Sequence, residues 1–522
     1  MDKNIVDHDE FHRKLREVSH DINVTHIFKD TIYGMAISTK SLNISELESF
    51  FGVSKVRHNT IKRITSYGDG TTLTWGLDRI DSKTLPLDGV YNHGFNGNNI
   101  DIYIVDTGID CNHNEFKSLP GRPAREVKNI YSAFTSNLLA DNDGQGHGTH
   151  VAATAGGNNV GVAPHANIFG VQVLNEDGEG STSDIVAALE FTLNNIKKRE
   201  RRSIVSMSLG GGCETDDCQE DTLVMVSEYL TTQNVVVVVA AGNSYCNACR
   251  GSPSAAHSAI NVGATNNKDF IATFSNYGQC IDVFAPGVDV VSSCANSICN
   301  DELRYISLSG TSMACPHVTG VVAQLMEKYN NASVDDIIRH LECDTSKSII
   351  KLDTIDTVSK NMLLQVPKID DNGFCELGLG CSNNCSSQGT CLTAHNNSKC
   401  HCNGGYFGQD CAFSSNPYCT NNKFTANFYD FGYDGWDYAR FQVTDSSGLI
   451  VDGALDSLCS GSFESNDFCL PYGCYNLDVS RGNYPGEVAW TFCSMEGSAP
   501  FQSTFCVELL QLKLKEHHLY FN

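Results

Sequence analysis

An aspartate, a histidine and a serine lie in three separate segments whose local sequence suits nucleophilic catalysis. Asp106 ends the apolar run in NIDIYIVDTGID, His147 lies between two glycines in DGQGHGTHVAA, and Ser312 begins a helical pattern in SLSGTSMACPHVTG. A serine hydroxyl becomes nucleophilic when a histidine takes its proton and a carboxylate orients the histidine ring. A helix start adds backbone amides that favour a developing oxyanion. The three segments together predict a site for attack on a carbonyl carbon.

Each of these residues also has an ordinary structural explanation. An aspartate after a strand commonly forms a turn, a histidine among glycines often only packs, and a serine before a helix is commonly an N-cap. His150 lies one helical turn from His147 and could pair with it at a metal. The acidic residue of an HExxH pattern is missing beside them, so we expect His150 to be structural. The coincidence of three suitable segments favours catalysis over the separate explanations.

The elements that must position these residues alternate along residues 69–365. Short apolar runs predict strands at 100–105, 204–209 and 235–240, and amphipathic patterns predict helices at 183–196 and 311–329. Strands that alternate with helices are typical of a mostly parallel sheet covered on both faces. We therefore expect an α/β fold for this region.

The segments DTGID, GHGTHVA and SGTSMACPH, in this order, resemble the three signature segments of the subtilisin superfamily, and most of all those of its proteinase K branch. TWGLDRID, SMSLGGG, VAAGN, FSNYG and FAPG extend the resemblance. The order aspartate, histidine, serine is the subtilisin order. The resemblance implies a subtilisin-like sheet flanked by helices and a serine endopeptidase that works through an acyl-enzyme. It implies that Ser312 attacks, His147 moves the proton, Asp106 orients the ring, and no cofactor is required.

The resemblance also implies how a protein or peptide substrate binds. Asn243 in AAGN would donate to the oxyanion, and an extended peptide would lie between two edge segments. These edges and the wall of the primary pocket comprise Gly178, Glu179 and Gly180, Ser208, Leu209 and Gly210, and Ala240, Ala241 and Gly242. Small apolar walls predict broad specificity with an apolar preference, rather than the paired basic residues of a kexin-like enzyme.

Two further expectations follow from the resemblance. Asp282, with the backbone carbonyls of His257 and Ala259, is a possible structural calcium site, since calcium prefers oxygen ligands; the alternative is an aspartate that caps a turn. Residues 1–68 resemble an inhibitory propeptide, which would be cut between about Arg63 and Thr72. The peptidase domain would then cover residues 69–365.

The cysteines predict an oxidising environment. The chain has 23, with none in its first 110 residues and thirteen between Cys375 and Cys506. Such density is typical of disulfide scaffolds made for the cell exterior or the secretory and endolysosomal pathway. Potential N-glycosylation sequons agree with this. The opening residues lack the apolar stretch of a signal peptide, and we expect the start to be incomplete.

Individual pairings follow from the resemblance and from loop length. Cys249–Cys280 matches a bridge of some relatives, and two short loops could be closed by Cys213–Cys218 and Cys294–Cys299. Cys315 stands where relatives have threonine, and we expect a buried, unpaired thiol. Residues 375–411 resemble an EGF-like module, whose family pairing would be Cys381–Cys391, Cys385–Cys400 and Cys402–Cys411.

Residues 412–510 are rich in aromatics and turn pairs and predict a β-sandwich-like domain, followed by a loose tail at 511–522. Tyr433, Trp436 and Tyr438 motivate a glycan- or matrix-binding hypothesis for this domain. The formal net charge of −25 makes nucleic acid and anionic membrane surfaces poor partners. We expect no membrane span. The alternative to an enzyme is a catalytically silent extracellular binding or adhesive protein on a protease scaffold.

Overall fold

The computed structural model describes residues 13, 22–49, 53–57, 59–63, 75–119, 124–136, 138, 143–213, 218–299, 304–352, 359–368, 389–394, 397–402, 406–407, 413–414, 423–430, 441–444, 450–456, 463–470, 473–480, 488–492, 495–507 and 513–514. The chain forms two compact units, one from residues 1–243 and 248–377 and the other from residues 244–247 and 378–522. None of the described helices is long and apolar enough to cross a membrane.

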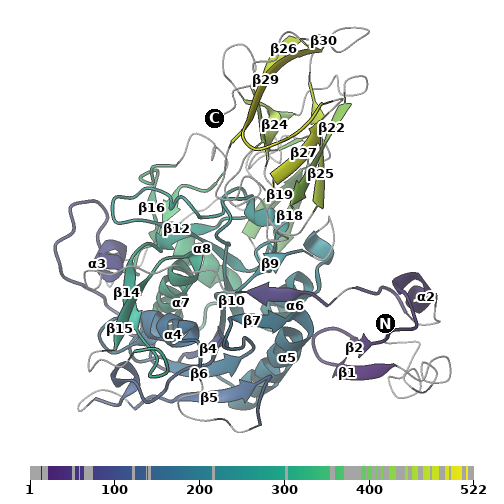
Figure 1. Ribbon diagram of the computed structural model, residues 1–522. Coiled ribbons are helices and arrows are strands. Elements are labelled where there is room, and N and C mark those ends of the chain that lie inside the picture. Colours follow the sequence, from purple (N-terminus) through teal and green to yellow (C-terminus); the bar gives the residue numbers. More distant parts are fainter. Residues whose placement is uncertain are drawn as a thin grey trace. The chain divides into compact units, whose positions relative to one another are not determined.

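The first unit is built on a nine-stranded sheet. Its strands are β4 (Asp101–Asp106), β5 (Val127–Ser132), β6 (Asn167–Gln172), β8 (Ser203–Met207), β10 (Val236–Ala240), β12 (Ile260–Thr265), β13 (Val283–Pro286), β16 (Ser346–Lys347) and β17 (Met362–Leu363). They lie in the order β16-β17-β13-β12-β10-β8-β4-β6-β5 (Figure 1). All neighbours from β5 to β17 run parallel, and only the β16–β17 pair within this sheet is antiparallel. The expected mostly parallel sheet is confirmed.

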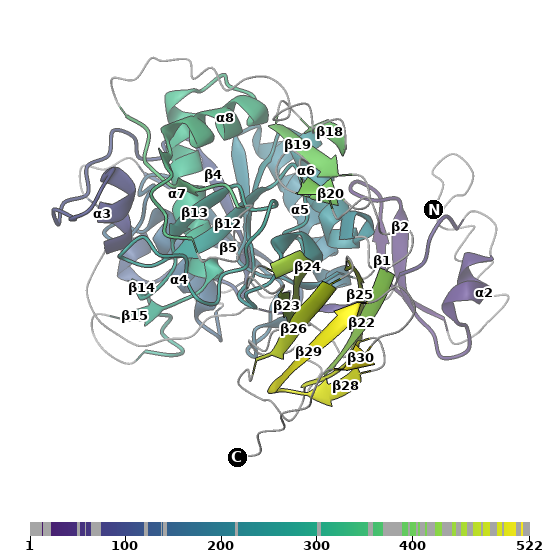
Figure 2. The same ribbon diagram turned by 90° about the horizontal axis from the view of Figure 1, so that it is seen from above.

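Helices cover both faces of this sheet (Figure 2). Helices α4 (His147–Gly156) and α7 (Thr311–Lys328) lie on one face, and α5 (Thr182–Arg199) and α6 (Thr222–Thr232) on the other. Strand β10 shows why its sequence is an unbroken apolar run. Val236 and Val238 pack in the core with α4 and α7, whereas Val237 and Val239 pack in the core with α5 and α6. Alternate side chains of a strand point to opposite faces, so every position of β10 is buried.

The remaining elements of the first unit after residue 75 are short. They are α3 (Trp75–Asp81), β7 (Glu179–Ser181), β9 (Gly211–Gly212), β11 (Gly251–Ser252), β14 (Val290–Ser293), β15 (Tyr305–Leu308), α8 (Val334–Asp344) and the 3₁₀ turns at Asn114–Phe116, Cys218–Glu220 and Ala248–Arg250. The predicted helix at 183–196 is observed as α5, capped by Ser181, whose hydroxyl accepts from the Asp184 amide. The helix predicted at 311–329 is observed as α7.

The leading segment, residues 22–63, packs on this body. It comprises β1 (Asn23–Phe28), β2 (Gly34–Ser38), α2 (Ile44–Glu48) and β3 (Ile61–Arg63). Strands β1 and β2 form an antiparallel hairpin, and Phe28 joins the core beneath α5. Strand β3 pairs antiparallel with β7 (Figure 1). Residues 61–63 of the leading segment are therefore held as an extra strand beside β7.

The second unit is antiparallel throughout its described strand pairs. Two hairpins are formed by β18 (Gly389–Ala394) with β19 (Asn397–Cys402) and by β20 (Tyr406–Phe407) with β21 (Phe413–Ser414). A four-stranded sheet contains β22 (Lys423–Asp430), β25 (Phe463–Cys469), β27 (Val488–Phe492) and β28 (Met495–Ser498). A five-stranded sheet contains β23 (Phe441–Thr444), β24 (Ile450–Asp456), β26 (Gly473–Val479), β29 (Phe501–Val507) and β30 (Lys513–Leu514).

One aromatic cluster joins these two sheets. The ring of Phe441 in β23 lies 5.2 Å from Phe428, 5.5 Å from Trp490 and 5.4 Å from Phe492. A disulfide between Cys474 and Cys506, which the sequence analysis did not pair, links β26 to β29. Residues 513–514 form a strand, so the tail expected from residue 511 is not loose over these two residues.

Several sequence predictions fall outside the described residues. They concern Cys381, Cys385, Cys411, Tyr433, Trp436, Tyr438 and the cleavage region after residue 63. The EGF-like pairings, each of which needs one of these cysteines, stay predictions.

Candidate active site

Asp106 and His147 form the centre of the site. Asp106 is the last residue of β4 and is fully buried, and His147 is the first residue of α4. Nδ1 of His147 lies 2.8 Å from Oδ1 and 3.0 Å from Oδ2 of Asp106. Among the described residues no group hydrogen-bonds Nε2 of this ring. The carboxylate therefore fixes the ring through one nitrogen and leaves the other to accept a proton.

A second buried aspartate holds the two segments together. The Thr107 hydroxyl donates to Asp143 over 2.9 Å and accepts from the Gly148 amide over 2.9 Å. Asp143 also accepts from the amides of Gly146 and Thr149. Burial raises the pKa of Asp143, and these hydrogen bonds oppose that shift. Sequence reasoning missed Thr107 and Asp143, although both stand within the segments that contain Asp106 and His147.

Ser312 lies in the first turn of α7, where the helix has free amides and the positive end of its dipole. Its side chain is buried, and its hydroxyl donates to the carbonyl of Ser208 over 3.1 Å. The hydroxyl of Ser208 donates in return to the carbonyl of Ser312 over 2.9 Å. The nucleophile candidate is thus held by the segment that follows β8.

Asn243 lies at the same helix start. Its Oδ1 accepts from both the amide and the hydroxyl of Thr311, each over 2.8 Å. The same hydroxyl accepts from the Gly242 amide over 3.1 Å. Because its oxygen is held by Thr311, the carboxamide of Asn243 presents its nitrogen on the other side. Thr311 is a third residue that sequence reasoning missed.

The predicted pocket wall and the predicted edge at Ser208 contact this helix start. Ala240 ends β10, and the Ala241 carbonyl accepts from the side chain of Asn276 over 2.8 Å. Gly242 has φ +102°, and a Cβ there would meet Asn276 at 2.5 Å, so only glycine fits. Ser208 and Leu209 are buried, and Gly210 leads into β9. Gly178 precedes β7, which contains Glu179 and Gly180, on the edge that binds β3.

Two other histidines and one cysteine near the site are buried and uncharged. Nε2 of His150 donates to the carbonyls of Val290 and Ile306, and burial lowers its pKa to about 3. Burial also lowers the pKa of His317 to about 4. The thiol of Cys315 is fully buried and free of disulfide, and burial raises its pKa to about 11. These groups support the structure rather than exchange protons near neutral pH.

The residues around Asp282 do not fit a calcium ion. One carboxylate oxygen accepts from the Asn261 amide over 3.0 Å, and the other lies 3.4 Å from Nζ of Lys360. Lys360 is also 2.6 Å from Glu342. Burial disfavours its charge, but Asp282 and Glu342 outweigh burial and raise the pKa of Lys360 to about 12. An ammonium ion of the protein itself therefore neutralises the carboxylate that calcium would need, beside His257 and Ala259.

Disulfides link several segments of the first unit. Bridges link Cys249 to Cys280, Cys213 to Cys218, and Cys294 to Cys299, in the pairings given above.

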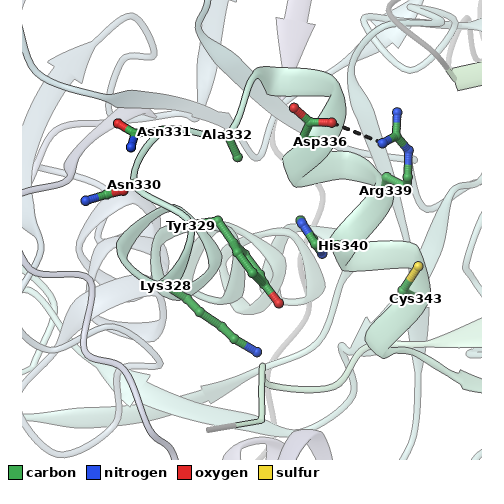
Figure 3. A pocket seen from close by; sticks show the side chains of 9 residues that line it. All are labelled: Lys328, Tyr329, Asn330, Asn331, Ala332, Asp336, Arg339, His340 and Cys343. Carbon is green, nitrogen blue, oxygen red and sulfur yellow. Dashed lines mark hydrogen bonds and ion pairs between the residues drawn. The ribbon is translucent and has the colours of Figure 1, made fainter. Parts of the chain in front are cut away.

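A pocket of about 380 Å³ lies between the end of α7 and α8, where the rings of Tyr329 and His340 stack at 3.7 Å (Figure 3). It contains none of the candidate site residues, so we do not connect it with the reaction.

The chain is similar to a family model and to several known serine proteases. The subtilase family matches residues 97–372. The chain is 36% identical to the extracellular serine proteinase of Thermus sp. (strain Rt41A) over 66% of its length and 78% of that protein. It is 36% identical to proteinase R of Parengyodontium album over 58% of this chain and 72% of that protein. It is 38% identical to a cuticle-degrading serine protease of Arthrobotrys oligospora over 52% of this chain and 62% of that protein.

A solved structure of a cold-adapted subtilisin-like serine proteinase matches at 35% identity and a TM-score of 0.49, covering 57% of this chain and all of that one. The family match and the sequence matches define the class: this is a subtilisin-like serine protease. The chain belongs to the subtilase family.

Proposed function

We propose that this chain is a secreted endopeptidase that cuts peptide bonds through an acyl-enzyme on Ser312. The observation that carries the proposal is the Asp106–His147 contact, which leaves Nε2 of the ring able to accept a proton. In the reaction the Ser312 hydroxyl turns from the Ser208 carbonyl, gives its proton to Nε2 and bonds to the scissile carbonyl carbon. The C–N bond then breaks as His147 returns the proton to the amine. Water, activated by the same ring, hydrolyses the acyl-enzyme.

The oxyanion would be bound by the Ser312 amide and the side chain of Asn243. Support comes from Thr311, whose two donors hold Oδ1 of Asn243 and so orient the amide nitrogen. The small residues Ala240, Ala241 and Gly242 would receive apolar side chains. We propose broad specificity with an apolar preference at this pocket.

A fluorophosphonate probe tests the assignment. We expect stoichiometric labelling of the processed enzyme, no labelling of Ser312→Ala, and normal labelling of the control Ser309→Ala, whose hydroxyl accepts from the Asp289 amide. Full proteolysis by purified Ser312→Ala would overturn the assignment. An unlabelled wild-type protein, even after removal of the leading segment, would support the silent binding scaffold instead.

The leading segment would act as an inhibitory propeptide. The carbonyl of Thr60 accepts from the Thr182 amide over 2.7 Å, and Asn59 accepts from the Ser183 amide over 2.9 Å. Farther back, His26 lies 3.0 Å from Asp184 on α5. These contacts hold an added strand where a substrate strand would lie. We expect purified full chain to label slowly with the probe, and Asn59→Ala to shorten the delay; immediate labelling of uncut wild type would contradict the proposal.

Secretion is supported by the disulfides and by the extracellular relative from Thermus. We also propose that residues 412–510 bind glycans or matrix. A glycan array probed with the intact Ser312→Ala protein, and with a version that ends at residue 411, tests this. Equal signals from both proteins would contradict it.

A further inference from the structure

The side chain of Lys62 makes an unusual contact with the peptidase region. Lys62 lies in β3 opposite Gly180 of β7, and its side chain is fully buried. Nζ donates to the carbonyl of Gly212 over 2.9 Å and lies 3.8 Å from Oδ2 of Asp221. A lysine amine is rarely buried unless a negative group compensates for lost hydration. The Gly212 carbonyl and the Asp221 carboxylate thus form a buried position that binds a cation.

Asp221 is fixed in the peptidase region independently of Lys62. It is fully buried and caps α6, where Oδ1 accepts from the amides of Leu223 and Val224. Oδ1 also accepts from the Ser252 hydroxyl over 2.5 Å. The other oxygen, Oδ2, faces the amine of Lys62. The contacts of Oδ1 all lie within the peptidase region, so the Asp221 carboxylate stays in place when β3 leaves.

A helix cap alone does not account for this arrangement. Serine or asparagine caps a helix about as well as aspartate. The neighbouring Glu220 also meets cations of the leading segment, Lys55 and Arg57, but it is about half exposed. Exposed pairs of that kind contribute little and select weakly. The buried pair is different, because a neutral side chain in the position of Lys62 would remove a cation from beside the buried Asp221 carboxylate.

We propose that Asp221 selects a lysine or arginine side chain of the substrate, at the substrate residue that lies opposite Gly180. The inference rests on the proposed function, in which a substrate strand takes the place of β3 along β7. The cation-selective position is separate from the apolar wall formed by Ala240, Ala241 and Gly242. The enzyme thus combines an apolar preference at its primary pocket with a basic preference at a single substrate residue that lies closer to the amino end of the substrate.

Quenched peptide substrates with one lysine moved through successive positions before the cut test the proposal. In each peptide the matched control replaces lysine by norleucine, which keeps the chain and removes the charge. We expect the processed enzyme to show a kcat/KM about tenfold or more higher for lysine at a single position. The ratio of the two substrates does not depend on how much enzyme is folded.

Two variants identify the group responsible. Asp221→Asn, which keeps a capping side chain, should bring the lysine-to-norleucine ratio close to one, and Asp221→Ser serves if the first variant folds poorly. Glu220→Gln should leave the ratio unchanged. A ratio near one at every position in wild type would overturn the proposal, as would a ratio that survives in Asp221→Asn or is lost in Glu220→Gln. Absence of all cleavage and probe labelling would instead refute the proposed function.

Discussion

The hydroxyl of Ser208 donates to the backbone carbonyl of Ser312 over 2.9 Å. In an α-helix this carbonyl would accept from the amide four residues later, but that residue is Pro316, which has no N–H. The Ser208 hydroxyl therefore replaces a helix hydrogen bond that the proline removes. This supplies the buried carbonyl with a donor right beside the candidate nucleophile.

A double-mutant cycle tests this replacement. Ser208→Ala leaves a buried carbonyl without its donor and should lower the free energy of unfolding by about 1–3 kcal/mol. Pro316→Ala restores the amide, so Ser208→Ala should cost clearly less in that background. Urea unfolding of all four proteins in an inactive Ser312→Ala background measures both effects. Equal costs of Ser208→Ala in the two backgrounds would contradict the explanation.

Asn243→Ala should reduce kcat by about 10²–10³, because one donor to the oxyanion is lost while the nucleophile and base stay. Thr311→Val removes the hydroxyl that donates to Oδ1 of Asn243 and accepts from the Gly242 amide, and keeps the Thr311 amide that also donates to Oδ1. It should therefore cause a smaller loss of kcat than Asn243→Ala, with little change in KM. Steady-state kinetics on one peptide, normalised to active sites with the probe, measure both. A larger loss in Thr311→Val would argue against the role of Asn243.

Two buried histidines should make the folded protein sensitive to acid. The pKa values of His150 and His317 are lowered from 6.5 to about 3 and about 4. Below about pH 6.5 the unfolded chain binds protons on both rings, and the folded chain does not. The free energy of unfolding is therefore not reduced by these rings above about pH 6.5. It decreases as the pH falls from about 6.5 toward 4, by about 1 kcal/mol per pH unit for each ring. Urea unfolding of Ser312→Ala at several pH values measures this slope.

The matched variant for this pH dependence is His150→Gln. Its side-chain amide can still donate to the two carbonyls, but it does not titrate. The slope of unfolding free energy against pH between about 6.5 and 4 should become shallower in His150→Gln. An unchanged slope would show that His150 does not contribute.

We expect Lys360, rather than a calcium ion, to neutralise the Asp282 carboxylate. We expect a chelator to leave the unfolding temperature of Ser312→Ala unchanged. Lys360→Met leaves Asp282 and Glu342 without their cation and should cost about 3–5 kcal/mol, as breaking a buried ion pair does. Lys347→Met, at an exposed lysine, is the control and should have little effect. A fall in unfolding temperature on chelation would restore the calcium hypothesis.

The sequence was most informative where function and structure depend on contiguous residues. Strands β4, β8 and β10 are short apolar runs because both of their faces are buried, and Asp106, His147 and Ser312 lie in contiguous signature segments. The contacts that sequence reasoning missed join distant segments. Thr107 with Asp143, Lys62 with Asp221, and Lys360 with Asp282 each depend on tertiary register, which no local pattern encodes. The calcium expectation was likewise made without Lys360, which lies 3.4 Å from Asp282 in the folded chain.

The order of the candidate site residues along the chain also bears on when activity can arise during synthesis. Asp106 ends β4 in the middle of the sheet, whereas Ser312 follows β12 and β13 and enters with α7. A ribosome releases the chain from its amino end, so the base and its carboxylate emerge long before the nucleophile. A nascent chain, or one truncated before α7, has no hydrolytic centre with which to cut itself or its neighbours. Under the proposed function, proteolytic capacity appears only once the peptidase fold is nearly complete, by which time the leading segment has already been synthesised.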